Sequence, residues 1–199
     1  MRKIDIKNPD CLNEIVKVLK AGGIVMHPTE TCYGFAVDIF NKRALDKLYE
    51  IKGRDDKSPV SILVDSYEMA ELYGVFSPKA VELAKKYWPG PLSLVVPRTH
   101  NLPKFLNKGQ DFVSIRVSGD DFCRKIPYLV NGPVSTTSAN KSKFKPLYSC
   151  DDVSQFGEDL DKIDLIVDGG VIPEIKPSTI AKVDSDIVTI LRQGETVVE

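Results

Sequence analysis

The sequence has few of the residues on which metal, redox and membrane functions commonly depend. Its 199 residues include four cysteines and two histidines, and the cysteines lack the CxxC spacing that is typical of zinc and redox sites. The wide separation of the four cysteines therefore favours reduced, buried or partly buried thiols. No apolar run reaches the length of a membrane span, and the first ten residues do not resemble a secretion signal. We therefore expect a cytoplasmic protein without a membrane partner.

Charge of one sign is also missing. The chain has 27 basic and 28 acidic residues, which gives a net charge of -1, so it has no overall positive charge for nonspecific binding to nucleic acids. Any anion site must then be a local cluster. The length and the 42% hydrophobic content suit one sizeable core, and we expect a single domain over residues 1–199.

Apolar periodicity predicts helices interspersed with strands. One helix is expected to begin at the capping residue Asn8, with Pro9 in its first turn, and to end before Gly22. Further helices are expected between Asn41 and Gly53, after Ser77, and across residues 120–130. Apolar and β-branched runs predict strands in the segments GIVMH, VSILV, LSLVV, FVSIRV, DLIVDGG, STIAKV and IVTILR. Because the later strands leave no room for crossover helices, the pattern predicts an α/β domain with a mixed sheet.

Several familiar active-site motifs are absent. The chain has no GxxxxGK[ST], GxGxxG, GxSxG or HExxH. His27 follows an apolar strand and precedes Pro28, a position more typical of a packed or capping histidine than of a catalyst. Catalysis by a histidine triad is therefore not expected, and the remaining candidates are cations and hydroxyl groups.

Two groups of cations could bind an anion. Lys52, Arg54 and Lys57 lie in one short segment after a predicted helix, where they could converge on a polyanion. They could equally complement the helix dipole in a solvated turn. Arg116 alternates with apolar residues, so it lies either on the solvent face of a strand or in a cleft that holds a carboxylate or phosphate.

Hydroxyl groups gather in two further segments. In PVSTTSAN, residues 133–140, neutral donors at a strand end could hold phosphate oxygens or a base, or could merely cap a turn. The segment HPTETCYG, residues 27–34, is either a simple strand-to-loop turn or a rigid polar wall that faces a ligand. Neither segment is specific by itself.

The order of these motifs is specific. In chain order they read GGIVMHPTETCYGFAVD, KGRDDKSPVSILV, WPGPLSLVV, VSIRV, STTSANKS, STI and ILRQG. Across nearly the whole chain this series resembles the YrdC/Sua5 family of threonylcarbamoyl-AMP synthases, in the short form with one YrdC-like domain. The resemblance implies a twisted open mixed sheet with flanking helices and a concave, locally positive cavity. It also implies a nucleotidyltransferase that makes L-threonylcarbamoyladenylate and pyrophosphate from L-threonine, bicarbonate and ATP, for the N6-threonylcarbamoyladenosine modification of tRNA position 37.

The resemblance further implies the roles of individual residues. The expected L-threonine contacts are Thr31, Arg116, Thr136 and Ser178. The expected ATP contacts are Lys52, Arg54, Ser58, Ser138, Asn140 and Arg192. Lys52 and Arg54 would also act in catalysis by stabilising charge, while Thr31 and Tyr33 would form a wall against the amino acid. No protein metal site is expected, so Mg²⁺ would arrive with ATP.

Two alternatives remain open at this point. One is a noncatalytic module that binds double-stranded RNA or tRNA, although the even charge and the lack of interleaved aromatics disfavour it. The other is the carbamoyl-adenylate domain of hydrogenase maturation proteins, whose acylphosphatase and zinc-finger modules have no room in this chain. For the synthase, the expected partners are downstream tRNA threonylcarbamoyl-transferase proteins, with weak direct tRNA binding.

Overall fold

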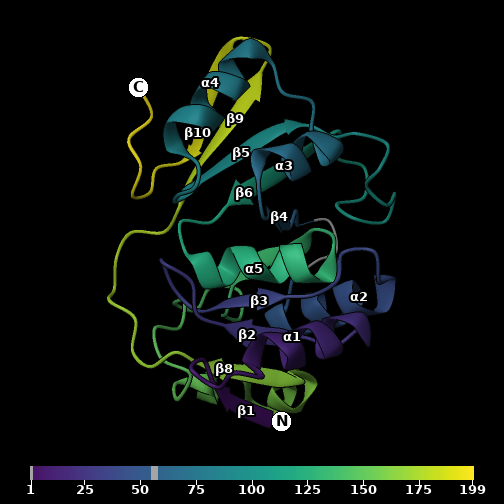
Figure 1. Ribbon diagram of the computed structural model, residues 1–199, viewed down its shortest axis with the longest axis vertical. Helices are drawn as coiled ribbons and strands as arrows, with labels where there is room; N and C mark the ends of the chain where they lie inside the picture. Colours follow the sequence, from purple (N-terminus) through teal and green to yellow (C-terminus); the bar gives the residue numbers. More distant parts are fainter. Residues whose placement is uncertain (1, 55–57) are drawn as a thin grey trace.

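The computed structural model describes residues 2–54 and 58–199, and its described strands form one mixed sheet (Figure 1). The order across the sheet is β1-β8-β2-β3-β7-β4-β6-β5-β9-β10. The strands are β1 (Arg2–Asp5), β2 (Val25–His27), β3 (Gly34–Ala36), β4 (Ser61–Val64), β5 (Leu92–Pro97), β6 (Phe112–Val117), β7 (Val134–Ser138), β8 (Leu165–Asp168), β9 (Thr179–Asp184) and β10 (Ile187–Arg192). The sheet contains parallel pairs such as β4–β6 and β5–β9 and antiparallel ones such as β5–β6. The predicted α/β class with a mixed sheet is confirmed.

Helices flank both faces of this sheet. They are α1 (Cys11–Lys20), α2 (Lys42–Lys52), α3 (Tyr67–Tyr73), α4 (Pro78–Tyr87), α5 (Asp121–Val130) and the 3-10 segment η1 (Val153–Lys162). On β4, Ile62 packs into the core cluster that includes residues of α2, α3, α4 and η1, whereas Leu63 packs into the cluster that includes residues of α1 and α5. Because successive strand residues face opposite sides, these two clusters lie on opposite faces of the sheet. No helix in the described ranges is long and apolar enough to cross a membrane.

Capping residues fix several helix ends as expected. The Asn41 side chain accepts a hydrogen bond from the backbone N–H of Ala44 at the start of α2, and Gly53 ends this helix with a φ of 56°. Ser77 caps α4 in the same way, and α5 spans nearly the predicted residues 120–130. Glycine adopts the left-handed backbone conformation more easily than other residues do, so Gly53 allows the chain to turn sharply after Lys52. Lys52 is thereby the last residue of α2.

The first helix begins later than expected. The Asn8 side chain accepts a hydrogen bond from the backbone N–H of Asp10, at 2.9 Å, which is the pattern of an Asx turn and not of a helix cap. The helix therefore starts at Cys11. The sequence analysis also missed η1 and the short elements β1, β3 and α3, which have four, three and seven residues.

Candidate active site

A cavity of about 340 Å³ lies across the central strands. Strand register explains how distant polar residues meet here, because Ser61 pairs with Thr136, and Leu63, two residues along β4, pairs with Arg116. Residues two apart on a strand share a face, so Ser61, Thr136 and Arg116 lie on the same side of the sheet. The described lining residues are Thr29, Thr31, Cys32, Gly34, Arg54, Pro59, Ser61, Ser93, Arg116, Thr136, Thr137, Ser138, Pro146, Pro177, Ser178, Ile180 and Arg192.

Most of the residues predicted for the site line this one cavity. They are Thr31, Arg54, Arg116, Thr136, Ser138, Ser178 and Arg192. Three of them are arginines, and the described lining contains no aspartate or glutamate, so the cavity favours anions. Lys52, Ser58 and Asn140 are not among the lining residues, although Pro59 next to Ser58 is. Lys57 lies outside the described residues.

Lys52 lies behind the cavity. It is 1% exposed, and its Nζ donates hydrogen bonds to the carbonyls of Ser138 and Asn140, the latter at 3.0 Å. Burial, and then the positive charge of Arg54, lowers the pKa of Lys52 to about 7. Lys52 thus supports the strand end that carries Ser138, and its direct contact with ATP stays a prediction.

The lowered pKa of Lys52 predicts a pH-dependent stability. Between about 7 and the ordinary value of 10.5, the unfolded chain binds more protons at this lysine than the folded chain does. The free energy of unfolding should therefore rise with pH in this window. Relative to Lys52→Met, which cannot titrate, we expect wild type to gain about 2 kcal/mol between pH 7 and 9. Urea unfolding of both proteins at the two pH values measures this difference, and parallel changes in the two proteins would contradict it.

Asn140 also organises the loop behind the cavity. Its Nδ2 donates to the carbonyls of Lys141 and Phe144, both at 2.9 Å, and its Oδ1 accepts a hydrogen bond from the Ser138 hydroxyl. Lys52 and Asn140 therefore act together on Ser138. Among these three, Ser138 is the residue that lines the cavity.

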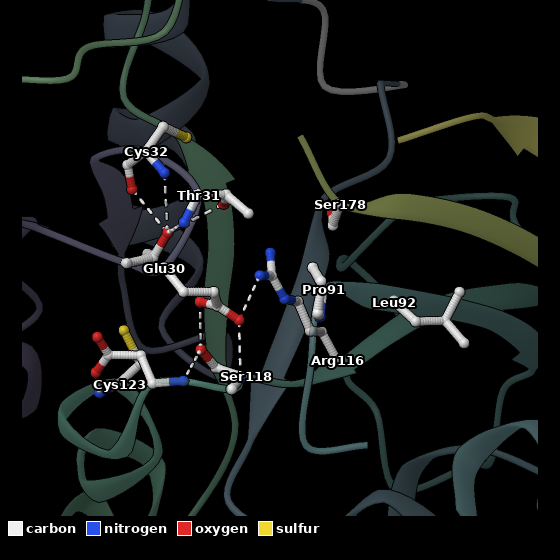
Figure 2. A network of polar contacts seen from close by, with 12 residues as sticks. Glu30, Thr31, Cys32, Pro91, Leu92, Arg116, Ser118, Cys123 and Ser178 are labelled. Atoms are coloured by element: carbon white, nitrogen blue, oxygen red, sulfur yellow. Dashed lines mark hydrogen bonds and ion pairs between the residues drawn. The ribbon is translucent and has the colours of Figure 1, made fainter. Parts of the chain in front are cut away.

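Arg116 forms an ion pair that the sequence analysis did not anticipate. Its Nη2 lies 2.7 Å from Oε1 of Glu30, and Figure 2 shows the guanidinium reaching toward this carboxylate. Burial opposes ionisation of Glu30, but the charge of Arg116 and hydrogen bonds from Ser118 and Gly119 hold the pKa of Glu30 below its usual value. Arg116 is 7% exposed, and its Nε has no hydrogen-bond partner within the described part of the chain. A buried guanidinium with an unpaired N–H group is suited to a carboxylate or phosphate ligand.

Arg192 and Ser178 are joined at another wall of the cavity. Nε and Nη2 of Arg192 donate to the Ser178 carbonyl at 3.0 and 2.7 Å, and Nη2 also donates to the Ser178 hydroxyl at 3.0 Å. The resemblance assigns Arg192 to ATP and Ser178 to threonine. The hydrogen bonds between Arg192 and Ser178 therefore join the expected ATP and threonine subsites.

The expected role of Tyr33 is wrong. Tyr33 is fully buried, and its hydroxyl donates to the Gly170 carbonyl at 2.7 Å and accepts from the Gly169 N–H at 3.0 Å. It anchors the loop to the segment after β8 because a buried phenol needs hydrogen-bond partners. Its neighbour Cys32 lines the cavity instead. The sequence analysis also missed Ser61, Ser93 and Thr137 as lining residues, since their positions depend on strand pairing and not on local motifs.

The family model of Sua5, YciO and YrdC proteins, described as "Telomere recombination", matches residues 17–194. The chain belongs to the Sua5/YciO/YrdC family. A family relative from Methanocaldococcus jannaschii, described as a putative threonylcarbamoyl-AMP synthase, is 31% identical over 183 residues, which are 92% of this chain and 85% of the relative. The family predicted from the order of the motifs is therefore confirmed.

Solved structures support the same family. The structure of Pyrococcus abyssi Sua5 complexed with L-threonine matches with a TM-score of 0.85 at 29% identity, over 97% of this chain and 57% of that chain. This chain thus spans little more than half the length of the P. abyssi Sua5. Full-length HypF, in its phosphate- and nucleotide-bound form, matches with a TM-score of 0.78 at 18% identity and covers 92% of this chain and 29% of that one, which shows a shared fold alone.

Proposed function

We propose that this chain is an L-threonylcarbamoyladenylate synthase. The threonine amine and bicarbonate form a carbamate with loss of water, and a carbamate oxygen then attacks the α-phosphorus of ATP. The bond to the departing pyrophosphate breaks as the new P–O bond forms, which makes the enzyme a nucleotidyltransferase. The observation that carries this proposal is a cavity lined by three arginines and many hydroxyl groups, with no carboxylate among its described lining residues.

The cavity residues divide between the two substrates. We assign the threonine carboxylate to Arg116, with Thr31, Thr136 and Ser178 completing the pocket, because a guanidinium matches a carboxylate in two parallel hydrogen bonds. Arg54, Arg192 and Ser138 would hold the phosphates and, with Lys52, stabilise charge in the transition state. Ser58 and Asn140 are further candidates beside ATP.

Magnesium enters this scheme as part of the nucleotide. Mg²⁺ prefers carboxylate oxygens, phosphates and water, and the described residues contain no group of three or more carboxylate, histidine or cysteine side chains placed to hold a metal. The phosphates of ATP would therefore supply the ligands, and the substrate would be the Mg²⁺ complex of ATP.

The adenylate product must be used by a further reaction. A threonylcarbamoyl adenylate is a mixed anhydride, so it suits transfer of the threonylcarbamoyl group to an amine such as N6 of adenosine at tRNA position 37. We propose that separate transferase proteins carry out this step in the cytoplasm, with weak direct tRNA binding by this chain. The noncatalytic RNA-binding module and the carbamoyl-adenylate domain of the HypF type are the competing functions.

One assay separates these three functions. Purified protein with Mg²⁺, ATP, bicarbonate and L-threonine should release pyrophosphate and form threonylcarbamoyl adenylate, detected by mass spectrometry. Omission of threonine or bicarbonate should abolish the adenylate, because the attacking carbamate needs both. Serine should react roughly 10- to 200-fold less efficiently, since it lacks one methyl group.

Other outcomes of the assay would favour the competitors. Pyrophosphate release that is independent of threonine, or that needs carbamoyl phosphate, would favour the HypF type. Absence of any turnover, together with salt-sensitive binding of RNA, would favour the noncatalytic module.

A further inference from the structure

Glu30 is the partly buried acidic partner of a cavity arginine and does not itself line the cavity. Two groups near the end of β6 hold its carboxylate: the Gly119 N–H donates to Oε1 at 2.8 Å and the Ser118 hydroxyl donates to Oε2 at 2.6 Å. The Ser118 hydroxyl also accepts from the Asp120 N–H at 3.2 Å, and Asp120 caps α5. These bonds fix the carboxylate to the backbone without any help from Arg116 (Figure 2).

Arg116, by contrast, has one described polar partner. Its Nη2 contacts Oε1 of Glu30 at 2.7 Å, while its Nε lacks a hydrogen bond among the described residues. An arginine side chain has large rotational freedom, and ordering it before the ligand arrives lowers the cost of binding. The fixed carboxylate of Glu30 is therefore placed to orient the guanidinium.

The charges around Arg116 also support a role for Glu30 in holding this guanidinium. The positive charge of Arg116 contributes to lowering the pKa of Arg192, after partial desolvation of the Arg192 guanidinium, so the two cations feel one another across the cavity. A buried cation without a partner is costly. Glu30 offsets this cost before a ligand binds, and because it lies outside the lining, the described lining residues include no acidic group.

We propose that Glu30 is the positioning residue for Arg116 and, through it, for the carboxylate of the amino-acid substrate. The inference rests on the proposed function, which supplies that substrate. It makes a directional prediction: removing the charge of Glu30 weakens threonine binding because Arg116 loses its orientation. If Glu30 instead competed with the substrate for Arg116, removing its charge would tighten threonine binding.

The test compares binding of L-threonine alone, by calorimetry, in wild type, Glu30→Gln, Glu30→Asp and Ser118→Ala. We expect Glu30→Gln to raise the threonine Kd on the order of 10-fold, in line with the loss of one charge-assisted contact. Ser118→Ala should raise it less, and the Kd for ATP should stay unchanged in both variants. Glu14→Gln is the matched control, because it removes the same charge from a surface residue that pairs with Arg2 and Lys17.

A second measurement needs no substrate. The Nε–Hε resonance of Arg116, assigned by its loss in Arg116→Lys, should be sharp in wild type and shifted or broadened in Glu30→Gln. If wild type fails to bind threonine while this resonance responds to Glu30→Gln, the proposed function fails and the positioning role stands.

Two results would overturn the positioning role. One is an unchanged or tighter threonine Kd in folded Glu30→Gln, and the other is an unchanged Arg116 resonance. Thermal unfolding verifies that each variant is folded. If Glu30→Gln does not fold, Glu30→Asp and Ser118→Ala replace it in the test. Glu30→Asp keeps a carboxylate beside Arg116, and Ser118→Ala keeps Glu30 itself.

Discussion

Arg116→Lys should raise the Kd and KM for L-threonine roughly 10- to 150-fold, the range that corresponds to losing about 1.5–3 kcal/mol from a hydrogen bond to a charged group. Lysine keeps the positive charge but cannot present two parallel N–H groups to a carboxylate. It also keeps a cation beside Glu30, so the partly buried carboxylate retains a partner. Isothermal calorimetry with threonine and steady-state kinetics measure the two constants.

The ATP constants provide the internal control for this variant. If Arg116 serves the threonine subsite, the KM for ATP should change by no more than about 2-fold, well under the 10-fold that one lost contact would cause. Unchanged threonine saturation in folded Arg116→Lys would remove Arg116 from the threonine pocket. A larger effect on ATP than on threonine would instead move it to the nucleotide subsite.

Local signals made much of the fold predictable. Asn41 and Gly53 mark the two ends of α2 because a cap and a left-handed residue act on their immediate neighbours. Arg116 could be recognised as unusual because it interrupts an apolar run. Such features depend on a few consecutive residues, so a single sequence carries them.

The remainder depends on contacts between distant segments. Glu30 lies 86 positions before Arg116 in the sequence, yet the two side chains pair, and nothing in the segment HPTETCYG, residues 27–34, indicates this partner. Tyr33 lies in the same segment and turns away, because its hydroxyl finds its partners after β8. The sequence predicts that Lys52 lines the cavity, but the side chain lies behind it, because the ammonium group donates to the carbonyls of Ser138 and Asn140.

Gly194 is another residue whose importance only tertiary contacts reveal. It follows β10 and packs against the backbone of residues 177–179, and its N–H donates to Oγ1 of Thr179 at 3.0 Å. A Cβ at this position would lie 2.0 Å from the Pro177 carbonyl oxygen and 2.5 Å from the Ser178 carbonyl carbon. Both are backbone atoms, so they cannot move aside as a flexible side chain would.

Gly194→Ala should therefore lower the free energy of unfolding by about 3 kcal/mol, the upper part of the usual range for overpacking. The forced shift falls on Ser178, which lines the cavity and holds Arg192, so the KM values for both threonine and ATP should rise. Gly132→Ala is the matched control, because a Cβ there meets no atom within 4 Å and should leave stability within about 1 kcal/mol of wild type. Urea unfolding and steady-state kinetics of the two variants test this difference. Equal stabilities and equal KM values would mean that the segment after β10 yields freely and does not hold Ser178 in place.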